Sequence, residues 1–180
     1  MRMSGVFAAM LTIVGATAGS AETAYERAVL AELNAARADP AAYARKLDTY
    51  RSYFRAKLVR LPGLKVDIET EEGVAVVDET IGFLGQQAPL AGLDSTTVLT
   101  TAAADHVAEQ AASGGTGHDG EDGSEPADRV KRRGGGPYVA EVIAYGPVDP
   151  VDVVRQLIVD DGVADRGHRS VLFSPELRYA

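Results

Sequence analysis

Residues 138–145 read Tyr-Val-Ala-Glu-Val-Ile-Ala-Tyr, and they form the clearest strand pattern in a chain whose other patterns are mostly helical. Side chains of a strand alternate between its two faces, so Glu141 shares a face with the apolar Val139 and Ile143. A carboxylate on an apolar face is costly unless a cation or a hydrogen-bond donor meets it. Glu141 is therefore a candidate functional residue.

Two histidines lie in glycine-containing turns on either side of this segment. They occur in Gly117-His118-Asp119-Gly120 and in Arg166-Gly167-His168-Arg169. For one such histidine alone, hydrogen bonding to the neighbouring backbone is the ordinary role. Two imidazoles and a carboxylate together predict a site that binds a divalent metal or exchanges protons. The third histidine, His106, lies among alanines in a helical segment, and we expect it to be structural.

Apolar periodicity predicts five helices. Asp39-Pro40 and Asp149-Pro150 each supply an N-cap followed by proline at the first helical position. The expected helices cover about 23–37, Pro40 to the break at Leu61-Pro62-Gly63, about 74–84, Ser95 to Ser113-Gly114-Gly115, and Pro150 to Asp160-Asp161-Gly162. A further strand is expected to begin at Val171-Leu172-Phe173.

Residues 1–21 have the pattern of a secretory signal peptide. Arg2 precedes an apolar run from Val6 to Ala18, and Gly19-Ser20-Ala21 offers small residues for cleavage. An uncleaved membrane anchor is the weaker alternative, because the run is short for a bilayer span. The sequence therefore predicts a secreted or periplasmic protein, with a single mature domain over residues 22–180 and no transmembrane segment in it.

Charge and composition exclude several classes of function. The 180-residue chain has a formal net charge of −8 and no cysteine, which excludes disulfides, thiol catalysis and cysteine-ligated zinc. The acidic balance argues against nucleic acid as a partner. Bases concentrate between Arg37 and Lys65, and none follows until Arg129. The acidic middle of the chain is either a solvated face or a mouth that concentrates cations.

Four stretches resemble, in order along the chain, the CAP superfamily of cysteine-rich secretory, antigen 5 and pathogenesis-related 1 proteins, in its bacterial SCP-like extracellular branch. They are Leu33 to Pro40, Ala102 to His118, Asp128 to Glu141, and Leu157 to Leu172. The last stretch contains Gly167-His168-Arg169. The ordered set spans most of residues 22–180 and is more specific than any of its motifs.

The resemblance implies an α+β fold, an α-β-α sandwich with helices on both sides of a small antiparallel sheet. It also implies a cavity lined by two histidines and two acids, which binds a divalent ion in some members. Imidazole and carboxylate ligands suit zinc first among divalent metals, and no organic cofactor is expected. Carried over by position, the metal-binding residues are His118, Glu141, His168 and Asp160, with Asp161 as the alternative second acid.

The resemblance also bears on the end of the chain. Family domains continue past the Gly-His-Arg motif with one or two further strands, whereas this sequence ends at Ala180. From the sequence we therefore expect a domain that is incomplete at its C-terminus and lacks the last strand or strands of the sheet.

Three functions are open at this point. The first is a binding module that holds a divalent cation and contacts an unidentified protein, lipid or cell-envelope ligand. The second is a metal-dependent, peptidase-like hydrolase in which Glu141 or Asp160 activates water. The third, suggested by some relatives, is a lipid- or sterol-binding protein. The sequence carries no nucleophile motif, so we favour binding over catalysis.

Overall fold

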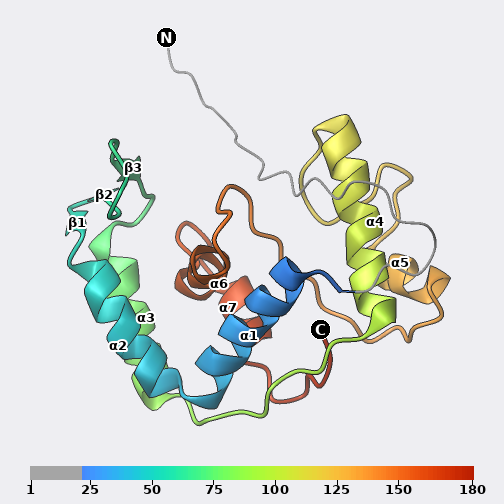
Figure 1. The fold of residues 1–180 in the computed structure, drawn as a ribbon, viewed down its shortest axis with the longest axis horizontal. Coiled ribbons are helices and arrows are strands. Elements are labelled where there is room, and N and C mark those ends of the chain that lie inside the picture. The colour runs from blue at the N-terminus through green and yellow to red at the C-terminus, as the bar shows by residue number, and fades with distance from the viewer. Residues whose placement is uncertain (1–21) are drawn as a thin grey trace. The chain divides into compact units, whose positions relative to one another are not determined.

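The computed structural model describes residues 22–180, which form helices and one small antiparallel sheet (Figure 1). This confirms the predicted α+β class. The predicted signal peptide, residues 1–21, lies outside the described residues. The helices are α1 (Ala24–Ala38), α2 (Pro40–Arg51), α3 (Val74–Gln86), α4 (Thr97–Ser113), α5 (Pro126–Arg132), α6 (Pro150–Val159) and α7 (Gly167–Leu172), and the strands are β1 (Phe54–Arg55), β2 (Leu58–Val59) and β3 (Ile68–Glu69).

The described residues divide into two compact units. The α4 unit comprises residues 22–30, Leu93–Val153 and Arg178–Ala180, and the α2–α3 unit comprises Ala31–Gly92 and Val154–Leu177. Helices α1 and α6 each contribute to both units. Each unit has its own candidate residues, with His118 and Glu141 in the α4 unit and Asp160 and His168 in the α2–α3 unit.

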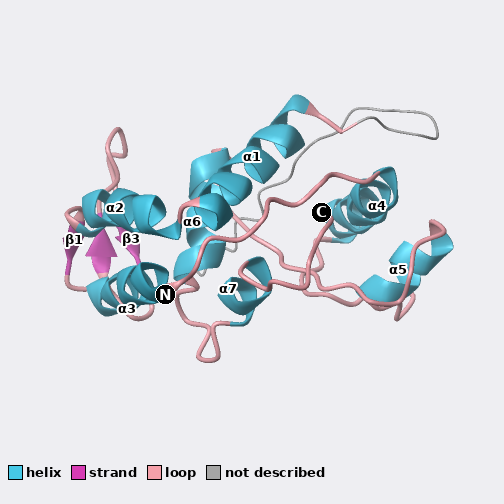
Figure 2. Ribbon diagram, turned by 90° about the horizontal axis from the view of Figure 1, so that it is seen from below, coloured by secondary structure: helices cyan, strands magenta, loops and turns pink. Residues whose placement is uncertain are grey.

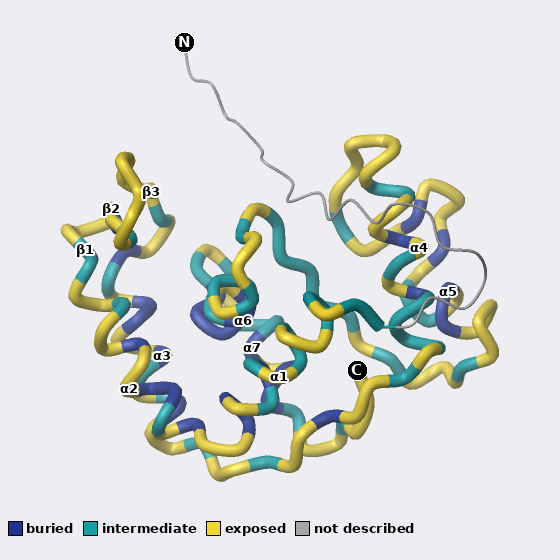
Figure 3. Tube along the Cα trace, in the orientation of Figure 1, coloured by how far each residue is buried: buried dark blue, intermediate teal, exposed yellow. Residues whose placement is uncertain are grey.

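Helices α2 and α3 pack side by side in the α2–α3 unit (Figures 1 and 2). As predicted, Pro40 lies in the first turn of α2, and the Asp39 side chain caps the helix by accepting the Ala42 N–H at 2.8 Å. Both helices contain buried apolar residues, and Figure 3 colours the buried positions of the Cα trace dark blue. These residues include Tyr43, Leu47, Val77 and Leu84.

Helix α2 ends at Arg51 and not at the predicted Leu61-Pro62-Gly63 break. The following residues form the β1–β2 hairpin, and β3 pairs with β2 (Figure 2). Ala56, in the hairpin turn, has a φ of 56°, a left-handed conformation that an α-helix does not accommodate. The four-residue spacing of Phe54 and Leu58 fits a helix, but the hairpin places these side chains on opposite faces of the sheet.

Gly73, which precedes α3, is required by the backbone geometry. Its φ is +75°, and a Cβ there would lie 2.7 Å from the Ala56 carbonyl oxygen. We expect Gly73→Ala to lower the free energy of unfolding by about 1–3 kcal/mol. Gly82 is the matched control, since it is helical and a Cβ there would meet nothing within 4 Å. Gly82→Ala should raise the free energy of unfolding by about 0.5–1 kcal/mol.

Urea denaturation followed by circular dichroism measures both glycine variants. Effects of the same sign and size would contradict the assigned geometry of the segment before α3.

Residues 171–173, predicted to begin a strand, lie at the end of α7 and just beyond it. The Phe173 N–H donates to the Arg169 carbonyl at 3.0 Å, which closes a helical turn. The buried Arg37 side chain fixes this end of α7. It donates to the carbonyls of Ala91, Leu172 and Ser174 at 3.0, 2.5 and 3.2 Å. One guanidinium on α1 thus joins two other backbone segments of the α2–α3 unit, at Ala91 and at 172–174.

Helix α4 begins after Thr96, whose hydroxyl accepts the Leu99 N–H at 3.3 Å, and not after the predicted cap Ser95. The helix ends at Gly114, which has a left-handed φ of 76°. This is the glycine-dependent stop that the sequence predicts.

Residues 138–145, predicted to be a strand, pair with no other strand among the described residues. No backbone–backbone hydrogen bond joins residues 138–144 to another residue within 22–180. A strand needs a neighbour for its N–H and C=O groups, and alternation reports only which side chains are apolar. The sheet is formed instead by β1 and β2, where a helix was predicted, and by β3, which follows the predicted helix break.

Candidate functional site

Glu141 lies between a histidine and a buried arginine in the α4 unit. Its Oε1 is 3.0 Å from Nδ1 of His118. Nη2 of Arg129 donates to both Glu141 oxygens, at 3.0 and 2.8 Å. Arg129 is only 5% exposed, so its charge faces the carboxylate with little water between them. This guanidinium supplies the cation that the sequence pattern predicts Glu141 to need.

Arg129 also holds the backbone beside the site. Its Nη1 donates to the carbonyls of His118 and Ser124, at 2.9 and 3.0 Å. One side chain therefore fixes both the backbone of His118 and the carboxylate that meets its ring. Sequence reasoning did not identify Arg129 as functional. The sequence feature that could have identified Arg129 is the charge of Glu141, which needs a cation as its partner. The sequence does not specify which cation this is.

The residue before His118 is clamped at both backbone groups. The Tyr145 hydroxyl accepts the Gly117 N–H at 2.8 Å, and Nε2 of Gln110 donates to the Gly117 carbonyl at 2.7 Å. Nε2 of His106 lies 2.9 Å from the same carbonyl, and His106 is 3% exposed, in agreement with the structural role expected for it. Gly117 has a φ of 103°, which glycine adopts without strain. These contacts pre-organise the loop that carries His118.

His168 and Asp160 form a second pair, in the α2–α3 unit. Nδ1 of His168 lies 2.6 Å from Oδ1 of Asp160, and Oδ2 accepts the Arg169 N–H at 3.1 Å. Asp160 is 2% exposed and follows α6 with a left-handed φ of 59°, a conformation that aspartate tolerates better than most residues. This turn directs its carboxylate to the first turn of α7, where His168 lies.

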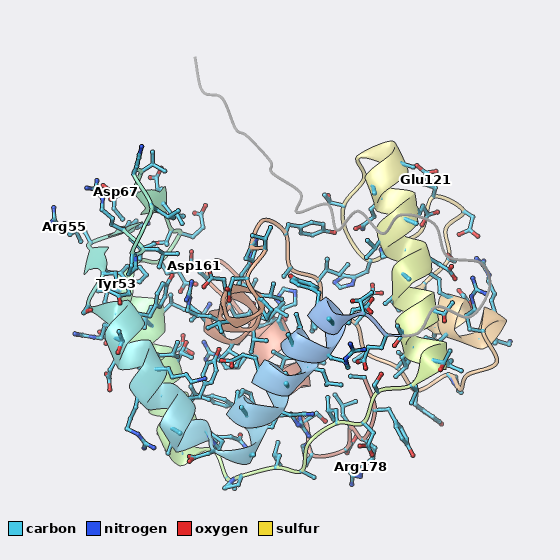
Figure 4. The ribbon with its side chains drawn as sticks, viewed as in Figure 1. Tyr53, Arg55, Asp67, Glu121, Asp161 and Arg178 are labelled. Atoms are coloured by element: carbon cyan, nitrogen blue, oxygen red, sulfur yellow. The ribbon has the colours of Figure 1, made fainter. Side chains whose placement is uncertain are left out.

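Asp161 has a different role from its neighbour. Its two carboxylate oxygens accept the N–H groups of Glu71 and Glu72, at 2.7 and 2.8 Å, in the segment before α3 (Figure 4). The sequence left the second acid open between Asp160 and Asp161. The geometry favours Asp160 as the partner of His168.

Arg166 ties the loop between α6 and α7 to α3. Its Nη1 donates to Glu72 at 2.7 Å, and its Nε donates to Glu79 at 2.9 Å. The hydrogen bond from Arg166, followed by the one from the Gly162 N–H, lowers the pKa of Glu72 to about 2. The same guanidinium lowers the pKa of Glu79. These carboxylates therefore stay ionised at neutral pH and hold the segment that leads to His168.

A pocket of about 150 Å³ lies beside α4 and α5, lined by Asp105, Glu109, Asp122, Ser124, Arg129 and Arg132. Its charged side chains are already paired: for example, Asp122 with Arg132 at 2.8 Å and Asp105 with Arg133 at 2.7 Å. Hydrogen bonds from Ser124, together with Arg132, lower the pKa of Asp122 to about 2. The Asp122 carboxylate, which also accepts the Ser124 N–H at 2.9 Å, is therefore engaged by its own neighbours in the structure.

The two imidazoles are arranged in the same way. Each has Nδ1 against a carboxylate, and neither Nε2 has a hydrogen-bond partner within the described part of the chain. With the Nδ1 proton donated to the carboxylate, Nε2 carries the lone pair with which imidazole binds metals or accepts protons. The His118 and His168 side chains are 48% and 26% exposed, so solvent reaches both.

Each pair by itself offers a metal ion one nitrogen donor. Among residues 22–180, no group of three or more histidine, aspartate or glutamate side chains is arranged to hold a metal ion. The structure thus brings His118 to Glu141 and His168 to Asp160. The expectation that all four residues serve one ion stays a prediction.

Comparison with known proteins gives one family. The model of the family described as "CAP: Cysteine-rich secretory protein family" matches residues 30–180. Searches of curated proteins and of solved structures gave no match. Within residues 22–180, no helix has both the length and the apolar character needed to cross a membrane.

Proposed function

The chain belongs to the CAP, or cysteine-rich secretory protein, family, and from this we propose that it is an exported binding module whose histidine–carboxylate pairs bind a divalent cation. Export rests on the signal-peptide pattern of residues 1–21. Cation binding rests on His118 with Glu141 and on His168 with Asp160.

One observation carries the proposal: a carboxylate meets Nδ1 of each imidazole. In metal sites, a histidine ligand commonly donates its second N–H to a carboxylate, which fixes the tautomer and makes the ligating nitrogen more basic. Glu141 and Asp160 both stand in this relation to their histidines. They therefore support the imidazoles in this proposal, and Nε2 of His118 and of His168 supplies the ligand atoms.

Zinc is the metal that this donor set fits best. Neutral imidazole suits zinc, and the chain offers no thiolate that would favour a softer ion. Bound zinc would supply Lewis acidity at the site. Arg129 meanwhile holds Glu141 in place, and the clamp on Gly117 fixes the approach of the His118 backbone.

Zinc titration of the purified protein by calorimetry tests this function. We expect His118→Ala and His168→Ala each to weaken zinc binding by more than about a hundredfold, because each removes a ligand. Glu141→Gln should weaken it by about 10–100-fold, because the ring loses its carboxylate support. The number of ions bound per chain also tests the expectation that all four residues serve one ion.

Asp119→Asn is the matched control for the titration. It removes a charge from an exposed residue next to His118, so zinc affinity should stay close to that of the unchanged protein. Unchanged affinity in both histidine variants, or an equal loss in Asp119→Asn, would contradict the proposed site.

Binding is better supported than hydrolysis by the surroundings of Glu141. Both of its oxygens already accept hydrogen bonds from Arg129, and Oε1 also meets His118. A carboxylate engaged in this way is poorly placed to take a proton from water. Turnover of peptides or esters that Glu141→Gln abolishes would reverse this preference.

A further inference from the structure

The small sheet at the end of the α2–α3 pair carries a cluster of exposed apolar side chains. Leu58, Leu64, Val66 and Ile68 are 42%, 44%, 67% and 42% exposed. Figure 3 shows the whole β1–β3 segment as largely exposed. Single exposed apolar residues are normal, but four of them within one short segment mark an interaction surface.

Cations are interleaved with these apolar residues. Arg55, Lys57 and Lys65 are exposed, and none of them forms an ion pair with another described residue. Figure 4 shows Arg55 extending outward from the sheet. Residues 54–69 contain four bases and two acids, in a chain whose net charge is −8. One of the two acids, Asp67, is already paired with the fourth base, Arg60, at 2.5 Å.

The register of the strands determines on which face of the sheet the apolar and the basic side chains lie. Arg55 pairs with Leu58, and Leu58 pairs with the exposed Glu69, so these three side chains share one face of the sheet. Val59 pairs with Ile68 on the opposite face, where Val59 is 1% exposed and belongs to the core, whereas Ile68 stays 42% exposed. Leu64, Lys65 and Val66 follow in the loop that leads to β3. We call the four apolar residues and the three unpaired cations the β1–β3 patch.

We infer that the β1–β3 patch docks the protein on an anionic lipid surface. Basic side chains are drawn to anionic headgroups, while apolar side chains among them enter the boundary with the acyl chains. A highly hydrated anionic polymer satisfies the cations but offers no apolar phase for Val66 and Leu64. The acidic remainder of the chain is repelled by the same surface, so that the patch makes the contact.

Co-sedimentation with vesicles of phosphatidylcholine and roughly one-third phosphatidylglycerol tests this inference. Lys57→Glu combined with Lys65→Glu should weaken partitioning at least about twentyfold, since each basic residue near such a surface contributes roughly fivefold. Leu64→Ser combined with Val66→Ser should weaken it without altering its salt dependence. Vesicles of phosphatidylcholine alone should bind little protein.

The matched control combines Arg45→Glu with Lys131→Glu, which makes the same change in net charge at exposed residues outside the patch. An equal loss in this control would overturn the inference, because net charge alone would then explain binding. The protein could instead bind a soluble polyanion but no vesicles, with the serine changes leaving that binding unaltered. This result would assign the patch to a polyanion. Concentration-dependent dimers that the lysine changes abolish would assign it to a second copy of the chain.

Discussion

Arg169→Met should lower the free energy of unfolding by about 3–5 kcal/mol. Arg169 is 3% exposed and donates to the carbonyls of Ile158 and Val159 at 2.7 and 2.9 Å and to the Thr80 hydroxyl at 2.6 Å. Methionine fills a similar volume but donates no hydrogen bond, so buried acceptors lose their partner. Glu79, which Arg169 contacts at 2.8 Å, loses a cation as well.

The matched control for Arg169 is Arg45→Met, in the same unit. Arg45 is an exposed residue of α2, so this change should alter the free energy of unfolding by less than about 0.5 kcal/mol. Chemical denaturation followed by circular dichroism measures both variants. A loss of less than about 1 kcal/mol for Arg169→Met would contradict the structural role of this guanidinium.

Arg129→Met should also lower the free energy of unfolding by about 3–5 kcal/mol, because it leaves Glu141 without its buried counter-charge. Nη1 of Arg129 additionally bridges the carbonyls of His118 and Ser124, so the loop between them loses its common donor. Arg132→Met, on the same helix, is the control. Arg132 is 58% exposed and pairs with the exposed Asp122, a contact worth less than about 1 kcal/mol.

A double-mutant cycle separates the charge of Arg129 from its other contacts. Combining Arg129→Met with Glu141→Gln removes the unpaired carboxylate. The double variant should therefore be more stable than the sum of the single losses predicts, by about 1–3 kcal/mol. Strict additivity would show that the pair contributes no coupling, and that Arg129 acts only through the backbone carbonyls that it bridges.

Helix boundaries governed by local chemistry could be predicted from the sequence. Asp39 caps α2 through its side chain, Asp149 accepts the Val151 N–H at the start of α6, and Gly114 ends α4 in the left-handed conformation. Each of these features depends on residues that are close in sequence. The identity of the neighbouring side chains is then enough to predict the hydrogen bond or the allowed backbone angle.

The position of the sheet could not be predicted in this way. Phe54 and Leu58 have helical spacing. A hairpin forms instead, because the chain turns at Ala56 and β2 pairs with β3 across a loop. Residues 138–145 have strand alternation but no described strand to pair with. Pairing is a long-range property, and a short apolar run fits either element until its neighbours are known.

The same distinction between local and long-range features applies to the candidate residues. Glu141 could be identified because an acid on an apolar face needs a partner, and the structure provides two of them. The clamp of Gln110 and Tyr145 on Gly117 joins parts of the chain that are distant in sequence. No sequence motif indicates these contacts, so they could not be predicted. Asp160 and Asp161 are adjacent acids, and only the direction of each carboxylate distinguishes their roles.

The buried arginines also determine how the formation of the native state depends on the redox conditions around the protein. Arg37, Arg129 and Arg169 each bridge backbone carbonyls in a chain without cysteine. Such bridges need no oxidant to form and no isomerase to correct them, so the native state is independent of the thiol–disulfide potential. They also disappear on unfolding, whereas a disulfide continues to restrict the unfolded chain. The unfolded protein therefore keeps its full conformational entropy, and it reforms these bridges each time it folds.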